Sequence, residues 1–288
     1  MPEALAAHAT AGEALSPEAF RQICDLMYKC FGIHISPAKK HLVISRLADT
    51  LRRKHLESYE DYVRQVLADP SGHELSSMVD ALTTNYTTFF REPEHFRFLA
   101  KTVIPGLKDR ASVRFWSAGC ATGEEPFSLA CCALEALGAV RPHIEIFATD
   151  ISTKALSSAE RGVYPTERFS DLPLGWKRRF LLRGEGKWEG WCRFKPEVYS
   201  TVRFGYLNLN EPFSGIGVFS AIFCRNVMIY FDQDARRRLI PRLIERLEPG
   251  GYLFPGHAES LSGVDHDLQL VEPAVYRKIT GKDEKCRT

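Results

Sequence analysis

Apolar residues recur at helical spacing in the first part of the chain. Ser16-Pro17-Glu18 has the form of a helix N-cap followed by proline at the first helical position, and Ser36-Pro37 repeats this arrangement. Along the second of these segments, three apolar residues share one helical side: Ile44, Leu47 and Leu51. The pattern predicts an all-α N-terminal domain over residues 1–82.

After Ser112 the pattern changes to short apolar runs separated by helical segments. The runs are Val113–Trp116, Glu145–Ala148, Val202–Leu207, Phe219–Phe223 and Tyr252–Phe254. Strands that alternate with helices indicate a mainly parallel sheet covered on both faces, as in Rossmann-like α/β folds. The preceding run Leu82–Glu92 starts with polar and β-branched residues, so it is predicted to connect the domains. The second domain is placed over residues 83–288.

One interval is too long for this alternation of single strands and helices. Asp150–Asn208 exceeds what a helix and two loops require, and within it Trp188–Tyr199 alternates apolar and polar residues between glycine-containing turns. This predicts a small antiparallel β-subdomain inserted at about residues 175–203.

Composition narrows the class of protein. The 288 residues are 44% hydrophobic and 26% charged, which is typical of globular proteins, and a net charge of +2 does not favour a nucleic-acid partner. The first 16 residues contain no Lys or Arg, and no apolar run reaches the roughly 20 residues that span a bilayer. We therefore expect a cytoplasmic monomer without membrane insertion. The eight cysteines contain no Cys-x-x-Cys pair, so reduced, buried thiols and no metal site are expected.

A glycine-rich turn joins the first predicted strand to a helix. Gly119 and Gly123 are separated by three residues, and Glu124, Glu125 and Pro126 follow at once. Dinucleotide binders use Gly-x-Gly-x-x-Gly instead, and two carboxylates would repel a pyrophosphate. They would attract a ligand that carries an ammonium and a sulfonium, which describes S-adenosylmethionine. By the motif alone, an equal alternative is that both glutamates only favour the positive helix end.

Polar residues follow three further strands. Asp150 ends the next strand, where nucleotide-binding folds place the acid that holds ribose hydroxyls, although a lone Asp there could instead cap a helix. Asn208 and the pair Arg225-Asn226 close later strands at the same edge, with ordinary loop polarity as the alternative. Because ligands bind at the carboxyl ends of such strands, this edge is the predicted site.

Four segments together resemble signatures of the chemotaxis receptor methyltransferases, the CheR-type enzymes. They occur in family order across nearly the whole chain: Asn85–Glu92 (NYTTFFRE), Gly123–Pro126 (GEEP), Phe223–Phe231 (FCRNVMIYF) and Gly256–Ser260 (GHAES). The resemblance implies a class I methyltransferase domain behind an all-α domain. It also implies a protein-glutamate O-methyltransferase that uses S-adenosylmethionine to form methyl esters on chemoreceptors, in support of sensory adaptation.

The resemblance also implies which residues form the site. The cofactor residues would be Asn85, Thr87, Arg91, Glu124, Glu125, Asp150, Asn208, Leu209, Arg225 and Asn226. Arg91 and Tyr230 would be catalytic and face the methyl group and the incoming glutamate, with Tyr230 expected at the end of its strand. Matching leaves open which glutamate of the pair contacts the cofactor, with Glu125 favoured.

Two receptor contacts are implied by the resemblance as well. The basic residues Lys39, Arg46 and Arg53, seven apart on the second helix, would face the acidic methylation region of a receptor, with a solvated helix face as the alternative. The β-subdomain would dock a receptor's C-terminal tail by strand addition. Its glycines resemble those of tail-binding members, although such turns are common: Gly184, Gly186 and Gly190.

Two other classes of function compete with this interpretation. A nitrogen methyltransferase typically carries Asn-Pro-Pro-Tyr after the fourth strand, where this chain has Arg225-Asn226-Val227-Met228. A cofactor-binding adaptor without turnover is disfavoured because the motif residues are intact.

A glutamate acceptor, with a pKa near 4.3, is already ionised at neutral pH, so the reaction needs alignment rather than a general base.

Overall fold

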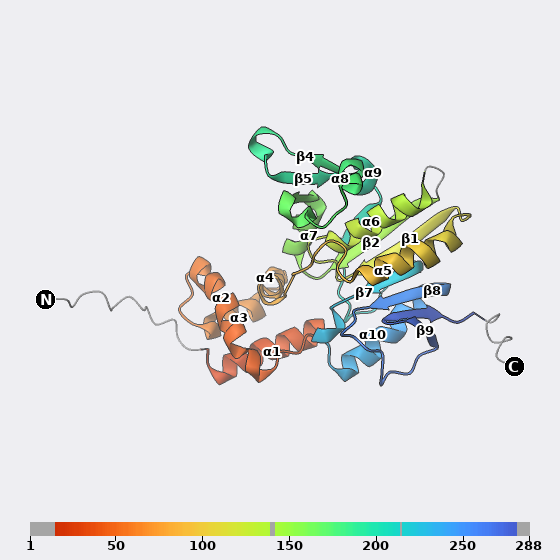
Figure 1. Ribbon diagram of the computed structural model, residues 1–288. Coiled ribbons are helices and arrows are strands. Elements are labelled where there is room, and N and C mark those ends of the chain that lie inside the picture. Colours follow the sequence, from red (N-terminus) through yellow and green to blue (C-terminus); the bar gives the residue numbers. More distant parts are fainter. Residues whose placement is uncertain (1–14, 139–141, 214, 281–288) are drawn as a thin grey trace. The chain divides into compact units, whose positions relative to one another are not determined.

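The computed structural model describes residues 15–138, 142–213 and 215–280. The chain divides into two compact units, Met1–Thr84 and Asn85–Thr288 (Figure 1). The first unit is all-α, as predicted. Its elements are α1 (Pro17–Phe31), the 3-10 turn η1 (Pro37–Lys39), α2 (Lys40–Lys54), α3 (Tyr59–Ala68) and α4 (His73–Leu82).

The two predicted helix starts of the first unit have different outcomes. Ser16 caps α1 as expected, since its hydroxyl accepts a hydrogen bond from the Ala19 amide at 3.1 Å. Ser36 makes no capping hydrogen bond and begins only the 3-10 turn. Placing Lys39 on the second helix was therefore wrong, because this 3-10 turn ends at Lys39 and α2 begins one residue later.

Each helix of the first unit buries a single stripe. In α1 the buried residues Ile23 and Met27 lie four apart, and in α2 Val43 and Leu47 repeat this spacing. Side chains on one face of a helix recur every three or four residues, and α1 packs against α3 while α2 and α3 pack against α4, so these stripes form the core of the unit.

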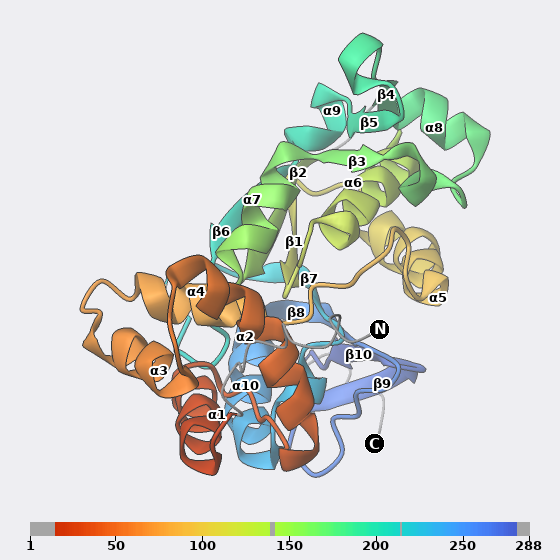
Figure 2. The ribbon, with the colours of Figure 1, turned by 90° about the vertical axis from the view of Figure 1, so that its left-hand side faces the viewer.

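A seven-stranded sheet organises the second unit, and Figure 2 shows it from the side. Its order is β6-β2-β1-β7-β8-β10-β9. The strands are β1 (Ser112–Ala118), β2 (His143–Asp150), β6 (Val202–Tyr206), β7 (Phe219–Cys224), β8 (Leu247–Pro255), β9 (Leu268–Glu272) and β10 (Val275–Lys278). The first five in this order are parallel, whereas β10 is antiparallel to both neighbours. All five predicted strands are confirmed; β9 and β10 were not predicted.

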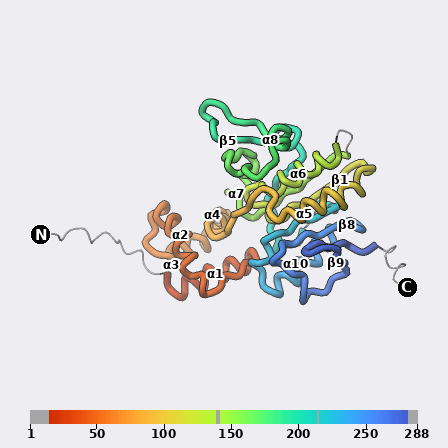
Figure 3. Tube along the Cα trace, in the orientation of Figure 1, coloured from red at the N-terminus to blue at the C-terminus, as the bar shows by residue number. Residues whose placement is uncertain are grey.

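Helices cover both faces of this sheet. Consecutive residues Phe115 and Trp116 of β1 pack into different apolar clusters, one on each face, and every residue of β7 is buried. This is the arrangement expected of a central strand in a parallel sheet. The helical elements, with the chain traced in Figure 3, are α5 (Pro93–Phe98), η2 (Leu99–Val103), η3 (Ile104–Leu107), α6 (Glu124–Leu137), α7 (Thr153–Arg161), η6 (Met228–Tyr230) and α10 (Gln233–Glu245).

The long interval between β2 and β6 contains the expected antiparallel sheet, but this sheet begins at Val163, earlier than the predicted start near residue 175. Its strands are β3 (Val163–Pro165), β4 (Leu181–Arg183) and β5 (Trp191–Phe194), in the order β3-β5-β4. The helical elements around them are η4 (Thr166–Phe169), α8 (Leu174–Phe180), η5 (Gly186–Trp188) and α9 (Pro196–Tyr199). Only part of the alternating stretch Trp188–Tyr199 forms a strand, because Gly190 has a positive φ just before β5 and Pro196 starts a helix just after it. We name Val163–Tyr199 the insertion.

None of the helices within the described residues has the length and apolarity that crossing a bilayer requires.

Candidate active site

The turn between β1 and α6 can be formed only with glycine at two positions. Gly119 and Gly123 have φ angles of 87° and 96°, in the left-handed region. A Cβ atom on Gly119 would lie 2.3 Å from Val227, and one on Gly123 would lie 2.8 Å from the Tyr164 hydroxyl. The amide of Gly119 also donates to the Thr149 carbonyl at 2.8 Å. The turn is therefore fixed against the neighbouring strand.

Asp150 holds this turn in place. Its carboxylate accepts hydrogen bonds from the amides of Ala121 and Ser152, both at 2.8 Å. The helix cap of α7 is Ser152, whose hydroxyl accepts from the Ala155 amide, so the alternative interpretation of Asp150 as that cap is wrong. Asn85 donates to the same Ser152 hydroxyl at 3.1 Å, which brings the start of the second unit to this edge.

The two glutamates of the turn point to different partners. Glu124 is buried and its carboxylate binds the guanidinium of Arg168 and, at 2.6 Å, the hydroxyl of Thr122. Glu125 accepts from the Ser117 hydroxyl at 2.6 Å and from Arg225 at 3.1 Å. Burial raises the pKa of Glu125, and Arg225 and Ser117 oppose that rise.

Arg225 is the charged centre of the site. Its side chain is only 2% exposed and pairs with Glu125 at 3.1 Å and with Glu92 at 3.2 Å. It also donates to the backbone carbonyl of Arg91 and lies over the Phe96 ring. One guanidinium therefore links the end of β7, the start of α6 and the connecting segment that begins the second unit.

A buried acid that was not predicted as a site residue supports the other side of this edge. Glu259 accepts from the amides of Asn226 at 2.6 Å, Gly256 at 2.7 Å and Ile229 at 3.1 Å. Burial raises its pKa, and these amide hydrogen bonds oppose the rise. Asn226 has a positive φ of 59°, and Glu259 holds its backbone there. The only sequence signal for this acid was its place in the segment Gly256–Ser260.

The remaining predicted residues lie at the same carboxyl edge or beside it. Asn208 follows β6 and binds the Asn210 amide and the Glu211 carboxylate, and Leu209 is buried in the cluster that contains Trp116. The carbonyl of Thr87 accepts from Arg168 at 2.6 Å. Arg168 was not predicted because nothing in its local sequence distinguishes it.

The two predicted catalytic residues have different settings. The Arg91 guanidinium donates to the Tyr86 carbonyl at 3.4 Å. Tyr230 ends the 3-10 turn η6, and β7 stops earlier, at Cys224. The prediction that Tyr230 closes its strand was wrong, because the chain turns after Arg225 and Asn226 takes a left-handed conformation.

A group of possible metal ligands adjoins Arg225. Among the described residues, Glu92, His95 and His257 bring ligand atoms within 4.8 Å of one another, which the sequence did not indicate because His257 is far from the other two along the chain. Burial lowers the pKa of His95 to about 4, so its ring is neutral at pH 7. The positive charge of Arg225, 3.2 Å from Glu92, opposes a cation at this position.

The donor set fits S-adenosylmethionine. Carboxylates at the ends of neighbouring strands suit an ammonium and ribose hydroxyls, and the turn brings backbone close to a ligand. An open, mainly parallel sheet with this acidic turn at its carboxyl edge defines a Rossmann-like methyltransferase domain that uses S-adenosylmethionine.

Comparison with known proteins gives the family. Residues 85–277 match the family described as CheR methyltransferase, SAM binding domain, and residues 18–83 match CheR methyltransferase, all-alpha domain. The chain belongs to the CheR methyltransferase family.

Several curated relatives extend over most of the chain. Chemotaxis protein methyltransferase 2 of Pseudomonas aeruginosa is 42% identical over 260 residues, which cover 90% of this chain and 92% of the relative. The chemotaxis protein methyltransferases of Salmonella typhimurium and Klebsiella aerogenes are each 38% identical; the matches cover 91% of this chain and 91% and 90% of those relatives, respectively. The chain is thus a methyltransferase dependent on S-adenosylmethionine and related to chemotaxis enzymes.

Proposed function

We propose that this methyltransferase forms methyl esters on glutamate side chains of chemoreceptors. The observation that carries the proposal is the carboxyl edge of the sheet, where Glu125, Arg225 and Asp150 gather around the glycine turn within a chain related to chemotaxis methyltransferases. A receptor glutamate is ionised at neutral pH and attacks without a general base. We place the reaction in the cytoplasm, on the cytoplasmic methylation region of the receptor.

The proposed roles of the residues follow from their contacts. S-adenosylmethionine, when bound, supplies an activated methyl group. Glu125 would accept hydrogen bonds from its ammonium, because its side chain is 12% exposed whereas that of Glu124 is 2% exposed and faces Arg168. Asp150 would hold the ribose hydroxyls while it fixes the turn.

Asn85, Thr87, Asn208, Leu209 and Asn226 would complete the cofactor site. Arg91 would orient the acceptor carboxylate, and Tyr230 would hold the acceptor or the methyl group. Holding the reactants in line can account for about 7–11 kcal/mol of the barrier.

The linkage formed on the receptor separates the candidate reactions. The full chain is incubated with methyl-labelled S-adenosylmethionine and receptor, and the product is then treated with mild alkali. Label released as volatile methanol supports the ester. Alkali-stable label would show nitrogen methylation, and no label at all would favour an adaptor without turnover; either result contradicts the proposal.

Two variants test the assigned residues. Asp150→Ala should weaken binding of S-adenosylhomocysteine at least about tenfold in calorimetric titration, since charged hydrogen bonds are lost. Exposed Asp171→Ala is its matched control. Arg91→Ala should lower turnover more than cofactor affinity, with Arg97→Ala, an exposed arginine paired with Glu94, as control. Unchanged affinity in Asp150→Ala would remove this carboxylate from the site.

The basic residues of the first unit are proposed to face the acidic methylation region of the receptor. Lys39 and Arg53 are exposed, whereas the guanidinium of Arg46 binds the Leu82 carbonyl and the Thr84 hydroxyl and thereby also holds the end of α4. Charge reversal at Lys39 and Arg53 should raise KM for the receptor and leave kcat unchanged. The control is Arg64→Glu, at an exposed arginine on α3. If the variant with reversed charges at Lys39 and Arg53 has the same KM for the receptor as the wild type, the assignment is refuted.

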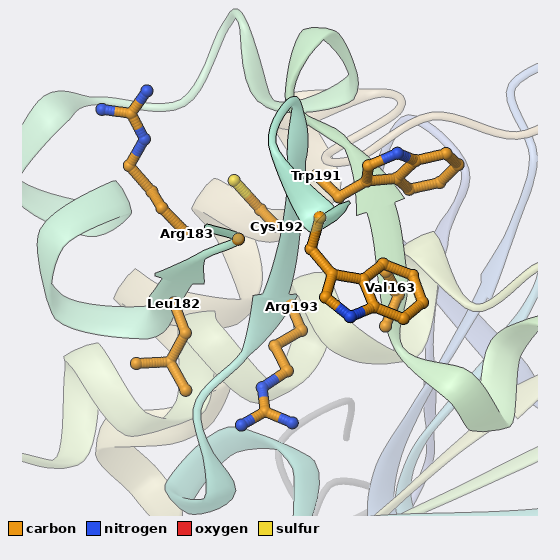
Figure 4. A pocket seen from close by; sticks show the side chains of 8 residues that line it. Val163, Leu182, Arg183, Trp191, Cys192 and Arg193 are labelled. Atoms are coloured by element: carbon orange, nitrogen blue, oxygen red, sulfur yellow. The ribbon is translucent and has the colours of Figure 1, made fainter. Parts of the chain in front are cut away.

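We also propose that the insertion docks a receptor's C-terminal tail. It contains a cavity of ≈ 540 Å³ between Leu182 and Arg183 on one outer strand and Val163 on the other (Figure 4). Trp188 and Trp191 are 52% and 41% exposed at this cavity, which favours an apolar segment.

The predicted glycines shape the turns beside this cavity. A Cβ on Gly184 would lie 2.1 Å from the Trp188 carbonyl oxygen, and Gly186 and Gly190 have positive φ angles. A labelled tail peptide should bind the wild type and lose affinity in Gly184→Val, because the side chain would displace the Trp188 backbone. Leu174→Ala, 71% exposed on α8, is the control. Equal peptide affinity in the wild type and Gly184→Val would exclude this docking site.

A further inference from the structure

The first part of the insertion reaches the glycine turn of the cofactor site. Tyr164 in β3 donates from its hydroxyl to the Thr122 carbonyl at 2.7 Å. Arg168 in η4 donates to the Thr87 carbonyl at 2.6 Å and to the carboxylate of Glu124. A short stretch of the insertion therefore binds both the turn and the segment that enters the second unit.

The ion pair between Arg168 and Glu124 is important because the glutamate side chain is buried. The Glu124 side chain is 2% exposed, and among the described residues Arg168 forms an ion pair with it. A buried carboxylate without a counter-charge is strongly unfavourable, so removing this guanidinium would drive the Glu124 side chain to a different position. The turn would then lose its geometry, because the same carboxylate holds the Thr122 hydroxyl at 2.6 Å.

We propose that Arg168 and Tyr164 are positioning residues through which the insertion sets the affinity for the cofactor. The proposal rests on the cofactor site proposed above. Neither side chain needs to touch the ligand itself. Arg168 fixes the glycine turn and the segment that contains Thr87 relative to one another. Tyr164, in β3 of the insertion, holds the turn as well.

The same strand connects this contact to the cavity of the insertion. Tyr164 is paired with Cys192 of β5, and Cys192 and Val163 line the cavity. A segment that binds there contacts the strand carrying Tyr164. Because coupling between two sites is reciprocal, occupation of the cavity and binding of the cofactor should change each other's affinity by the same factor.

Binding of S-adenosylhomocysteine to the full chain tests the proposal without a receptor. Arg168→Ala should weaken binding at least about tenfold, and Tyr164→Phe, which removes one hydroxyl, by a few-fold. Arg168→Lys should recover part of the loss, since an ammonium can pair with Glu124 but lacks the planar fork of arginine. Arg178→Ala, an exposed arginine on α8, should bind as the wild type does.

Kinetics separate positioning from a structural role. At saturating donor, Tyr164→Phe should keep the wild-type kcat while its KM for the donor rises, and its urea midpoint should fall by no more than about 0.5 M, as expected for the loss of one hydrogen bond. Wild-type affinity in a folded Arg168→Ala would overturn the proposal. If that variant does not fold, wild-type affinity and KM in Tyr164→Phe would overturn it. If the wild-type chain leaves no alkali-labile label on the receptor, that result would instead contradict the ester assignment alone.

Discussion

Replacing Arg225 by alanine should destabilise the second unit strongly at alkaline pH. The substitution leaves Glu125 and Glu92 without the guanidinium that lies 3.1 and 3.2 Å from them, in a place where that side chain is only 2% exposed. Breaking a buried ion pair by removing one partner costs about 3–5 kcal/mol. With a urea slope of about 3 kcal/mol/M, the midpoint should fall by about 1–2 M.

The loss should depend on pH in a defined direction. Burial already raises the pKa of Glu125 in the folded protein, and Arg225 limits that rise, so the pKa should climb further in Arg225→Ala. A carboxyl with a raised folded pKa stabilises the protein at low pH, and this contribution disappears as pH rises through the folded pKa. Going from pH 8 to pH 6 should recover up to about 2.7 kcal/mol in the variant, at 1.36 kcal/mol per pKa unit.

Tryptophan fluorescence measures the unit concerned, because all four tryptophans, at 116, 176, 188 and 191, lie in Asn85–Thr288. Unfolding in urea is followed at pH 8 and pH 6 for the wild type, Arg225→Ala and Arg225→Ala with Glu125→Gln. The second substitution removes one uncompensated carboxylate and should restore part of the stability at pH 8. An equal loss at both pH values, with no recovery from Glu125→Gln, would refute this account.

Three further predictions follow from other parts of the structure. Gly123→Ala should cost about 1–2 kcal/mol or more and weaken binding of S-adenosylhomocysteine, because its φ of 96° and the nearby Tyr164 hydroxyl leave no room for a Cβ; Gly106→Ala, with open space around its Cβ, is the control, and equal affinities would contradict the reasoning. Ser16→Ala should lower the protection of α1 against hydrogen exchange by about 1 kcal/mol through loss of its cap, and unchanged protection would count against that cap. Burial raises the pKa of the Cys120 and Cys224 thiols, so both should react with a thiol reagent far more slowly in the native protein than in urea, as mass spectrometry of the labelled peptides would show.

Local sequence patterns determined the elements and their order. The helical spacing of Leu47 and Leu51, the five apolar runs and the Gly119–Gly123 turn each reflect interactions between residues that are close along the chain, so the all-α unit and the parallel sheet could be predicted from them. The local patterns failed where the backbone conformation depended on neighbouring segments of the fold. Lys39 fell in a 3-10 turn and Tyr230 in a short 3-10 segment after β7, and neither difference shows in hydrophobic periodicity.

Tertiary structure alone decided which charges meet. Glu124 and Glu125 are adjacent in sequence, yet one pairs with Arg168 of the insertion and the other with Arg225 after β7. Arg168 carries no local signal, and the motif that contains Arg225 does not reveal its ion-pair partners, since each partner is chosen by how distant segments converge at the carboxyl edge of the sheet. The sequence by itself therefore determined that an acidic glycine turn opens the α/β unit. Only folding determined how its two carboxylates are neutralised, because burial makes a counter-charge necessary while chain topology selects the residue that supplies it.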